Sequence, residues 1–245
     1  MIKTRAIARL DIKNNNVIKG IQLEGLRKVG NPKELIQKYY RAGIEEIFLL
    51  DCVASLYGRN NLFQFIKQIS EECFVPITLG GGIRSIRDVE DALDSGADKI
   101  YVNSQLVRNP SFIEEIIIKY GSQVLVAGID AKKIGENWKV LIDSGREETG
   151  LLVEGWLKVL VDKGVGEIMV TSIDMEGCKK GFDIELVKEV SKLSNVPIIA
   201  SGGCGSLTHV RKLINNVNVE GISFASVLHY NILEISQIKQ ILIND

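Results

Sequence analysis

Two aspartates stand at equivalent points in the two halves of the chain and have the chemistry to move protons. Asp11 ends an apolar run in ARLDIK, and Asp130 ends another in AGIDAK. Two carboxylates whose surroundings push their pKa values apart can act as a general acid and a general base. The pattern predicts a catalytic pair at the rim of a buried core and leaves open which aspartate is the acid.

Two glycine-rich segments of nearly the same sequence, VPITLGGGIRS and VPIIASGGCGS, could each bind a phosphate group. At Gly82 and Gly203 a backbone without side chains can approach a ligand closely. A helix that begins at Ser85 or Ser206 would turn its free N–H groups toward the same point, as phosphate binding requires. For either segment alone, a tight turn without a ligand is the alternative explanation.

A second pair of turns follows the next apolar run in each half. Asn103 and Ser104 form the first of these turns, and Ala225 and Ser226 form the second. Backbone N–H groups and hydroxyls at these turns can add hydrogen-bond donors for an anion. We therefore expect two phosphate sites that face each other.

A lysine near the N-terminus could bring a cation to such an anion. Lys19 lies in VIKGIQLEGLR, between the first apolar run and the first helix, and Gly20 and Gly25 follow it. This segment has the character of a long loop that closes over a substrate. A mobile, solvated lysine is the alternative.

Charged residues also stand at the starts of four of the expected strands. They are Arg5, Glu46, Lys99 and Glu167. Opposite charges gathered at one end of a barrel can pair into a plug, which would satisfy them and could gate a small polar molecule. Pairing for stability alone would explain them as well.

The elements that position these residues can be predicted from apolar runs that alternate with amphipathic stretches. This pattern is typical of buried parallel strands covered by helices. The runs predict eight strands, near 5–11, 46–51, 75–80, 99–103, 124–130, 167–172, 196–200 and 221–225. Helix starts are predicted at Asn31-Pro32, at Asn109-Pro110 and at Ser85, which stands three residues before an aspartate. Helix ends are predicted at Gly43, Gly96 and Gly164.

The second half of the chain repeats the first with a nearly constant shift of about 120 residues over four successive strand motifs. Eight parallel strands with crossover helices close most economically into a barrel. We therefore predict one (βα)8 TIM barrel domain over 1–245, built from two duplicated half-barrels at about 1–120 and 121–245. A doubly wound sheet is the alternative architecture.

Composition narrows the classes of function. The chain of 245 residues is 45% hydrophobic and 25% charged, with a formal net charge of -1. This balance supports a large core and offers no broad positive field for nucleic acid or lipid. No stretch has the apolar length of a signal peptide or a membrane span, so we expect a cytoplasmic protein. The spacing of four cysteines and two histidines predicts no metal site, no cofactor site is recognised, and both histidines are interpreted as structural.

Taken together, the motifs resemble the HisF family, the cyclase subunits of imidazole glycerol phosphate synthase. The resemblance rests on LDIK, VIKGIQ, DCVAS, GGGIRS, ADKIYVNS, VRNP, GSQVLVAGIDAK, TSIDMEG, ASGGCGS and ASVLHY, in this order along the chain. The sister isomerase family of the same pathway shares the duplicated barrel and the paired aspartates. It fits less well, because DCVAS, AGIDAK and ASVLHY are similar to the cyclase.

This resemblance implies an activity. The substrate would be the phosphoribulosyl formimino aminoimidazole carboxamide ribotide, with one phosphate at each glycine-rich site. Asp11 and Asp130 would cleave it and close an imidazole ring, giving imidazole glycerol phosphate and an aminoimidazole carboxamide ribotide. Lys19 would hold the closing loop, and Glu176 and Gly177 would lie beside one phosphate. A glutaminase docked at the N-terminal face of the barrel would send ammonia past the charged plug.

Several residues depart from the family pattern. Arg9 stands where a cysteine is usual and, by strand alternation, points into the barrel with Asp11. It needs a carboxylate partner, whose pKa it would lower. Tyr101 occupies an inward position where a small residue is common, and in TSIDMEGC Glu176 keeps a charge while Cys178 loses a hydroxyl. An alternative is therefore a HisF-like paralogue that works with a glutaminase and an amidotransferase in sugar amidation for surface polysaccharides.

Overall fold

The computed structural model describes residues 4–13, 15–52 and 62–244. The last three residues of the DCVAS motif lie outside this part of the chain. In the described part, no helix combines the length and the apolar character needed to cross a membrane.

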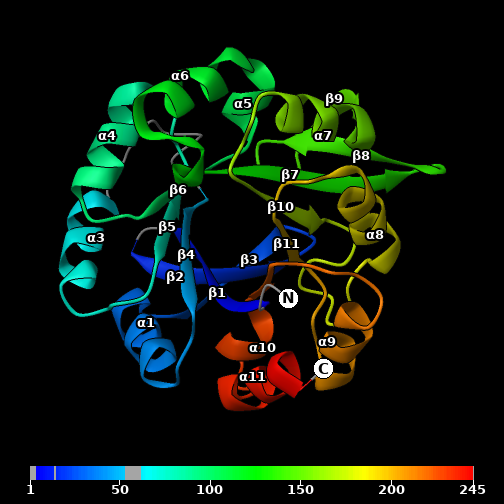
Figure 1. Cartoon of the computed structure of the whole chain (residues 1–245). Helices are drawn as coiled ribbons and strands as arrows, with labels where there is room; N and C mark the ends of the chain where they lie inside the picture. Colours follow the sequence, from blue (N-terminus) through cyan, green and yellow to red (C-terminus); the bar gives the residue numbers. More distant parts are fainter. Residues whose placement is uncertain (1–3, 14, 53–61, 245) are drawn as a thin grey trace.

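Eight parallel strands close into a barrel, which confirms the predicted fold class (Figure 1). They are β1 (Arg5–Lys13), β4 (Glu46–Asp51), β5 (Ile77–Gly80), β6 (Lys99–Val102), β7 (Leu125–Ile134), β10 (Glu167–Ser172), β11 (Ile198–Ser201) and β12 (Gly221–Phe224). Each strand pairs in parallel with the next, and β12 pairs with β1 to complete the circle. The doubly wound alternative is therefore wrong. The predicted bounds of β4 and β10 match the structure, and the other strands differ at their ends.

Helices form a ring around this barrel (Figure 1). They are α1 (Pro32–Arg41), α3 (Leu62–Ser70), α4 (Ile86–Asp94), α6 (Ser111–Tyr120), α7 (Val153–Asp162), α8 (Ile184–Leu193), α9 (Leu207–Ile214) and α11 (Ile235–Asn244). Shorter helical segments are α5 (Ser104–Arg108), η1 (Ser122–Val124) and α10 (Ser226–His229).

Most of the predicted helix boundaries are confirmed. The side chain of Asn31 accepts hydrogen bonds from the first turn of α1, and Ser85 forms a capping box with Asp88 at α4. The predicted helix start at Asn109 is wrong. Asn109 directly follows α5, and its side chain accepts a hydrogen bond from the Ser111 hydroxyl rather than from a helical N–H. The three glycines predicted at helix ends, Gly43, Gly96 and Gly164, all have positive φ.

Two β-hairpins stand on the barrel, and the first of them lies where the sequence pattern predicted a long loop. In the first half β2 (Asn16–Ile21) and β3 (Glu24–Gly30) follow β1, and in the second half β8 (Asn137–Ile142) and β9 (Glu147–Leu152) follow β7. Both β1 and β7 run past their aspartate, so the next strand pairs with the extension in antiparallel fashion: Asp11 lies opposite Ile18, and Asp130 lies opposite Leu141. The duplication thus extends to these hairpins.

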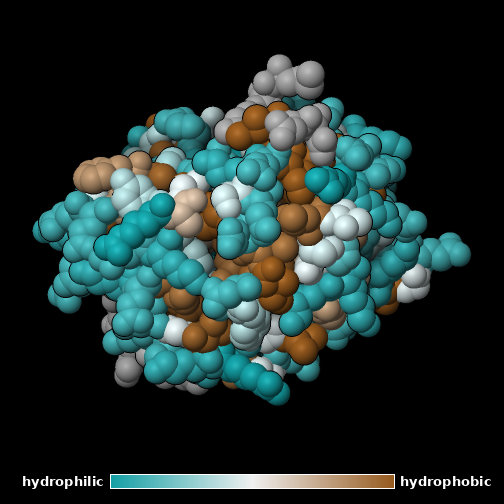
Figure 2. Space-filling view, turned by 90° about the horizontal axis from the view of Figure 1, so that it is seen from below, coloured by the Kyte–Doolittle hydropathy of each residue, from teal (hydrophilic) through white to brown (hydrophobic). Residues whose placement is uncertain are grey.

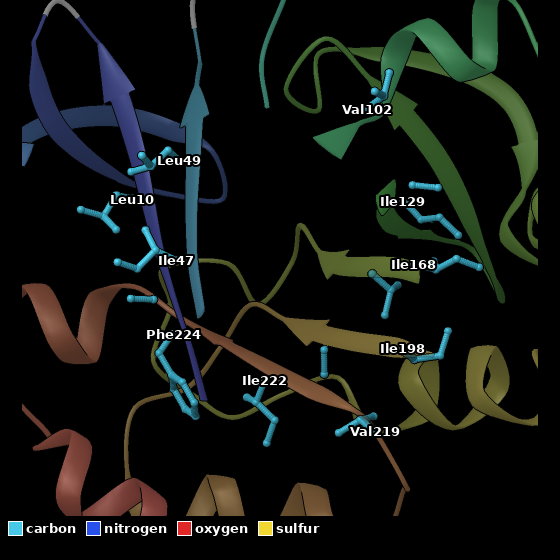
Figure 3. Close-up of a cluster of buried hydrophobic side chains, with 14 of the residues drawn as sticks. Leu10, Ile47, Leu49, Val102, Ile129, Ile168, Ile198, Val219, Ile222 and Phe224 are labelled. Carbon is cyan, nitrogen blue, oxygen red and sulfur yellow. The ribbon is translucent and has the colours of Figure 1, made fainter. Parts of the chain in front are cut away.

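Side chains alternate between two apolar layers along each strand, as the pleat requires. The larger layer lies between the strands and the helices, and Figure 3 shows part of it, including Leu10, Ile222 and Phe224. A smaller cluster fills the interior of the barrel: Ile7, Phe48, Leu50, Tyr101, Val126, Met169 and Ile199. The interior is therefore packed with side chains and is not an open pore.

The surface on the α11 side is mostly hydrophilic, with hydrophobic residues gathered in the middle of this face (Figure 2). Partly exposed apolar residues occur between α10 and α11, where Ile232 exposes 42% of its surface. Partly exposed apolar residues are normal on a protein surface.

The serine caps of α4 and α9 are open to a stability test. Ser85 accepts a hydrogen bond from the N–H of Asp88, and Ser206 accepts one from the N–H of His209. We expect Ser85→Ala to lower the free energy of unfolding by about 1 kcal/mol, because a helix N–H loses its partner. Ser206→Ala is the matched variant in the other half and should lose a similar amount. Urea denaturation measures both, and unchanged midpoints for the pair would contradict this account of the caps.

Candidate functional site

Five charged side chains are buried together where the barrel strands end. Arg9 and Asp11 lie on β1, Lys19 on β2, Asp130 on β7, and Glu176 on the loop after β10. The Nε of Arg9 donates to Oδ1 of Asp11 at 2.8 Å. The Nζ of Lys19 forms an ion pair with Glu176 and lies 3.5 Å from Oδ2 of Asp11. Asp130 has no ion pair with any described residue. The side chains predicted to carry the chemistry are therefore gathered in one place.

The two aspartates have opposite pKa shifts. Burial by itself would raise the pKa of Asp11, but the neighbouring Arg9 and Lys19 outweigh it and lower the pKa to about 2. Burial also raises the pKa of Asp130, and here it dominates: despite the opposing effect of Arg9, the pKa rises to about 6. Asp11 is thus held as an ionised carboxylate, whereas Asp130 can carry a proton near neutral pH.

A pocket of about 270 Å³ opens above these carboxylates. It is lined by the predicted residues Asp11, Lys19, Gly82, Asn103, Ser104 and Asp130. Four basic side chains also line it: Lys13, Arg84, Arg108 and Arg146. The first half of the barrel therefore supplies a surface rich in basic side chains next to the two aspartates.

A second, smaller pocket of about 20 Å³ lies at the equivalent place in the other half. The predicted residues Glu176, Gly177, Gly203, Ala225 and Ser226 all line it. Arg9 and Glu176 line both pockets. All the residues predicted to bind phosphate are thus divided between two neighbouring pockets, as the duplication suggests.

Glycine is required at the second pocket for a steric reason. Gly203 has a φ of +102°, and a side chain there would collide with the carbonyl oxygen of Gly181. The backbone N–H of Gly181 donates to the carbonyl of Gly203 at 2.8 Å. The loop after β10 and the loop after β11 are thereby held against each other beside the pocket.

Lys19 differs from its predicted setting. It lies in a strand, exposes 4% of its surface, and makes two buried ion pairs instead of moving freely on a loop. Burial alone would lower the pKa of Lys19, but Glu176 and Asp11 raise it above its ordinary value. The sequence pattern missed this because the partner, Glu176, is far away along the chain.

The basic rim of the first pocket was also missed by the sequence analysis. Arg84 directly follows GGGI, which could have been a signal. Arg108 and Arg146 carry no local signal, since α5 and the second hairpin bring them to the pocket. Arg108 donates to Asp143 at 2.6 Å, so its position is tied to that hairpin.

At the opposite end of the barrel, the four predicted charges form a ring of alternating sign. Glu46 lies 2.9 Å from Nη1 of Arg5 and 3.0 Å from Nζ of Lys99. Glu167 completes the ring, 3.0 Å from Lys99 and in contact with Arg5. Every charge in this ring has two partners of opposite sign, so the end of the barrel is neutral and closed by side chains.

Tyr101 lies in the interior of the barrel, between this ring and the two buried aspartates. Its ring meets Phe48 edge to face at a centroid distance of 6.2 Å. A side chain at position 128 would overlap the Tyr101 hydroxyl, so the glycine at this position leaves room for the tyrosine. The tyrosine narrows the interior at this level, in agreement with its predicted inward position.

The two histidines have structural contacts. The hydroxyl of Tyr39 and Nδ1 of His229 are 2.7 Å apart, and burial together with Lys19 lowers the pKa of His229 to about 4. Nδ1 of His209 accepts the N–H of Gly205. Cys52, Cys73, Cys178 and Cys204 form no disulfides. Within the described ranges, no cluster of three or more His, Cys, Asp or Glu residues could hold a metal ion.

Comparisons with known proteins bear on this site. The sequence profile of a family described as "Histidine biosynthesis protein" matches residues 5–234. The imidazole glycerol phosphate synthase subunit HisF of Legionella pneumophila is 51% identical over 208 residues, which cover 84% of this chain and 98% of the relative. The HisF subunit of Bacillus cereus is 41% identical over 245 residues, covering 100% and 97% of the two chains. That of Myxococcus xanthus is 39% identical over 242 residues, covering 99% and 96%. With the closed barrel and its paired aspartates, these matches establish that the chain belongs to the histidine biosynthesis protein family, among the HisF subunits of imidazole glycerol phosphate synthase.

Proposed function

We propose that this chain catalyses the cyclase reaction of imidazole glycerol phosphate synthase. The reaction converts the phosphoribulosyl formimino aminoimidazole carboxamide ribotide and ammonia to imidazole glycerol phosphate, an aminoimidazole carboxamide ribotide and one molecule of water. The observation that carries the proposal is the pair of buried aspartates with opposite pKa shifts, placed where two anion pockets meet. Relatives that are 39% to 51% identical are named as HisF subunits of imidazole glycerol phosphate synthase, which supports the proposal.

A substrate with a phosphate at each end would place one phosphate at each of the two pockets, and the second pocket would have to widen to admit it. One phosphate would enter the first pocket, where Gly82 and Ser104 offer a close approach and the basic rim supplies charge. The other would enter the second pocket at Gly203 and Ser226. The reacting centre between the phosphates would then lie over Asp11 and Asp130. Fixing both ends of a substrate in this way supplies much of the orientation that catalysis needs.

The opposite pKa shifts support different roles for the two aspartates. Asp11, with a pKa near 2, is ionised at neutral pH and can accept a proton as ammonia enters and the ring closes. Asp130, with a pKa near 6, can hold a proton and donate it to the nitrogen of the departing ribotide. After one turnover, Asp11 carries the extra proton and Asp130 lacks one, so exchange with solvent must restore both.

Ammonia would come from a glutaminase subunit docked at the N-terminal face. The ring of Arg5, Glu46, Lys99 and Glu167 lies at this face and would have to open for ammonia to pass. Beyond it, ammonia would pass Tyr101 to reach the aspartates. The relatives are named as synthase subunits, which implies a partner for them.

A second candidate function rests on the interior of the barrel. Arg9 holds one catalytic carboxylate in an ion pair, and Tyr101 narrows the proposed ammonia path. Both features suit a paralogue that passes ammonia to another acceptor, such as a sugar that becomes amidated. The names of the relatives favour the cyclase over this candidate.

Turnover with ammonium salt alone separates these candidates. We expect the purified chain to form imidazole glycerol phosphate from the ribotide under saturating ammonia. Asp11→Asn and Asp130→Asn should each lower kcat by about a hundredfold or more, because each removes a proton-transfer group. Asp94→Asn, at the exposed end of α4, is the control and should retain full activity. A wild-type chain that folds but forms no product would favour delivery of ammonia to another acceptor.

The pH dependence of kcat/KM tests the assigned roles. If Asp130 must be protonated and has a pKa of about 6, kcat/KM should fall as pH rises above that value, by about tenfold per pH unit. Asp11 stays ionised above its pKa of about 2 and adds no limb in this range. The free ammonia concentration must be held constant at each pH. The assignment is wrong if kcat/KM instead rises through pH 6, since Asp130 would then act as the base.

A further inference from the structure

Arg9 connects the catalytic pair to the second pocket. Its Nε donates to Asp11, while its Nη1 donates to Thr171 Oγ1 at 3.3 Å and to Ser201 Oγ at 3.4 Å. The latter two hydrogen bonds are long and go to neutral hydroxyls. The guanidinium also lines both pockets. One end of this cation is therefore strongly held, and the other reaches weakly toward the second pocket.

Among the described residues that line the second pocket, one buried hydroxyl has no hydrogen-bond partner. The hydroxyl of Ser223 is buried, lines this pocket, and has no hydrogen-bond partner among the described residues. Such a group is costly to bury unless a ligand or water satisfies it. Ser201 and Ser226 add two more buried hydroxyls to the same lining.

Arg9 is the one cation among the described residues that line this pocket. The charged neighbour, Glu176, is an anion already paired with Lys19. A phosphate in the pocket would therefore meet hydroxyls, backbone N–H groups and a single guanidinium. Arginine suits this position, because its planar fork can donate to an oxyanion through two nitrogens at once.

We propose that Arg9 is a binding residue for the phosphate that enters the second pocket, and that this phosphate and Asp11 compete for the same guanidinium. The proposal rests on the proposed function, which supplies a substrate with a phosphate at this end. When the phosphate is bound, the hold of Arg9 on Asp11 weakens, and Asp11 becomes a better proton acceptor. Occupation of the second pocket thereby prepares the base for reaction.

Inorganic phosphate is a direct probe of this role, and it needs no turnover. Calorimetry gives the affinities, and crystals soaked in phosphate show which pocket is filled. We expect phosphate in both pockets of the wild-type chain. In Arg9→Gln the affinity of the second pocket should fall about tenfold or more, because a hydrogen bond to a charged group is lost. An Arg9→Gln chain that fills the second pocket as readily as wild type would overturn the proposal.

Arg9→Lys is a second variant that tests the proposal even if Arg9→Gln does not fold. It keeps a cation beside Asp11 but lacks the fork that reaches Thr171 and Ser201. It should fold and still bind phosphate in the second pocket more weakly than wild type. Arg146→Met is the matched control, since Arg146 lines the first pocket alone and its loss should weaken phosphate there without changing the second.

Competition for the guanidinium is tested by removing the competitor. Asp11→Asn should tighten phosphate binding in the second pocket, because it releases Arg9. Asp130→Asn removes a nearby carboxylate without releasing Arg9, so it should tighten binding less. In the double variant Arg9→Gln/Asp11→Asn the gain from Asp11→Asn should vanish.

The proposed competition would be wrong if Asp11→Asn and Asp130→Asn raised the phosphate affinity of the second pocket equally, or if the rise persisted without Arg9. Either result would mean that the loss of any nearby negative charge is enough. These measurements leave the reaction aside. A chain that binds phosphate as described but makes no imidazole glycerol phosphate would refute the proposed function and not the role of Arg9.

Discussion

The need to compensate buried charge governs the functional end of this barrel. A buried ionised group is strongly unfavourable unless an opposite charge or hydrogen bonds offset its lost hydration. Here two cations, Arg9 and Lys19, face three carboxylates. Both cations are committed, to Asp11 and to Glu176, and Asp130 is left without an ion pair among the described residues. A proton on Asp130 offsets the cost of its burial, and this imbalance of charge explains why the pKa values of Asp11 and Asp130 shift in opposite directions.

At the opposite end of the barrel, charges also compensate one another, and there the numbers of cations and carboxylates are equal. Two cations and two carboxylates alternate around its ring, and each contacts both neighbours of opposite sign. No charge is left over there, so the ring is suited to closing the barrel rather than to proton transfer. Between the two charged ends lies the apolar layer around Phe48 and Tyr101. The interior is thus divided into a ring of balanced charges, a packed apolar layer and a buried cluster whose charges do not balance.

The two halves of the barrel share the framework of the site, and residues that differ between the halves make its two sides unlike. Hairpins, positive-φ glycines and serine caps recur in both halves. The residues of the interior do not recur in this way. Gly128 stands at the position equivalent to Arg9, and Ser223 stands at the position equivalent to Tyr101. Because Gly128 leaves room, the Tyr101 hydroxyl lies against it. Ser223 is left in the small pocket that Arg9 also lines. The two anion pockets consequently differ in size and charge, although their loops are alike.

The sequence by itself determined the barrel, its eight strands, the caps of α1 and α4, the opposed aspartates and the two glycine-rich turns. These follow from local rules: strand periodicity, capping side chains and the freedom of glycine act over a few residues and survive in any context. Only the tertiary structure decided that Lys19 is buried in a strand, that Arg108 and Arg146 reach the first pocket, and that Asp130 has no ion-pair partner in the described chain. Those outcomes depend on groups far apart along the chain. A pKa is set by which charges folding brings within a few ångströms, and that information is absent from any local pattern.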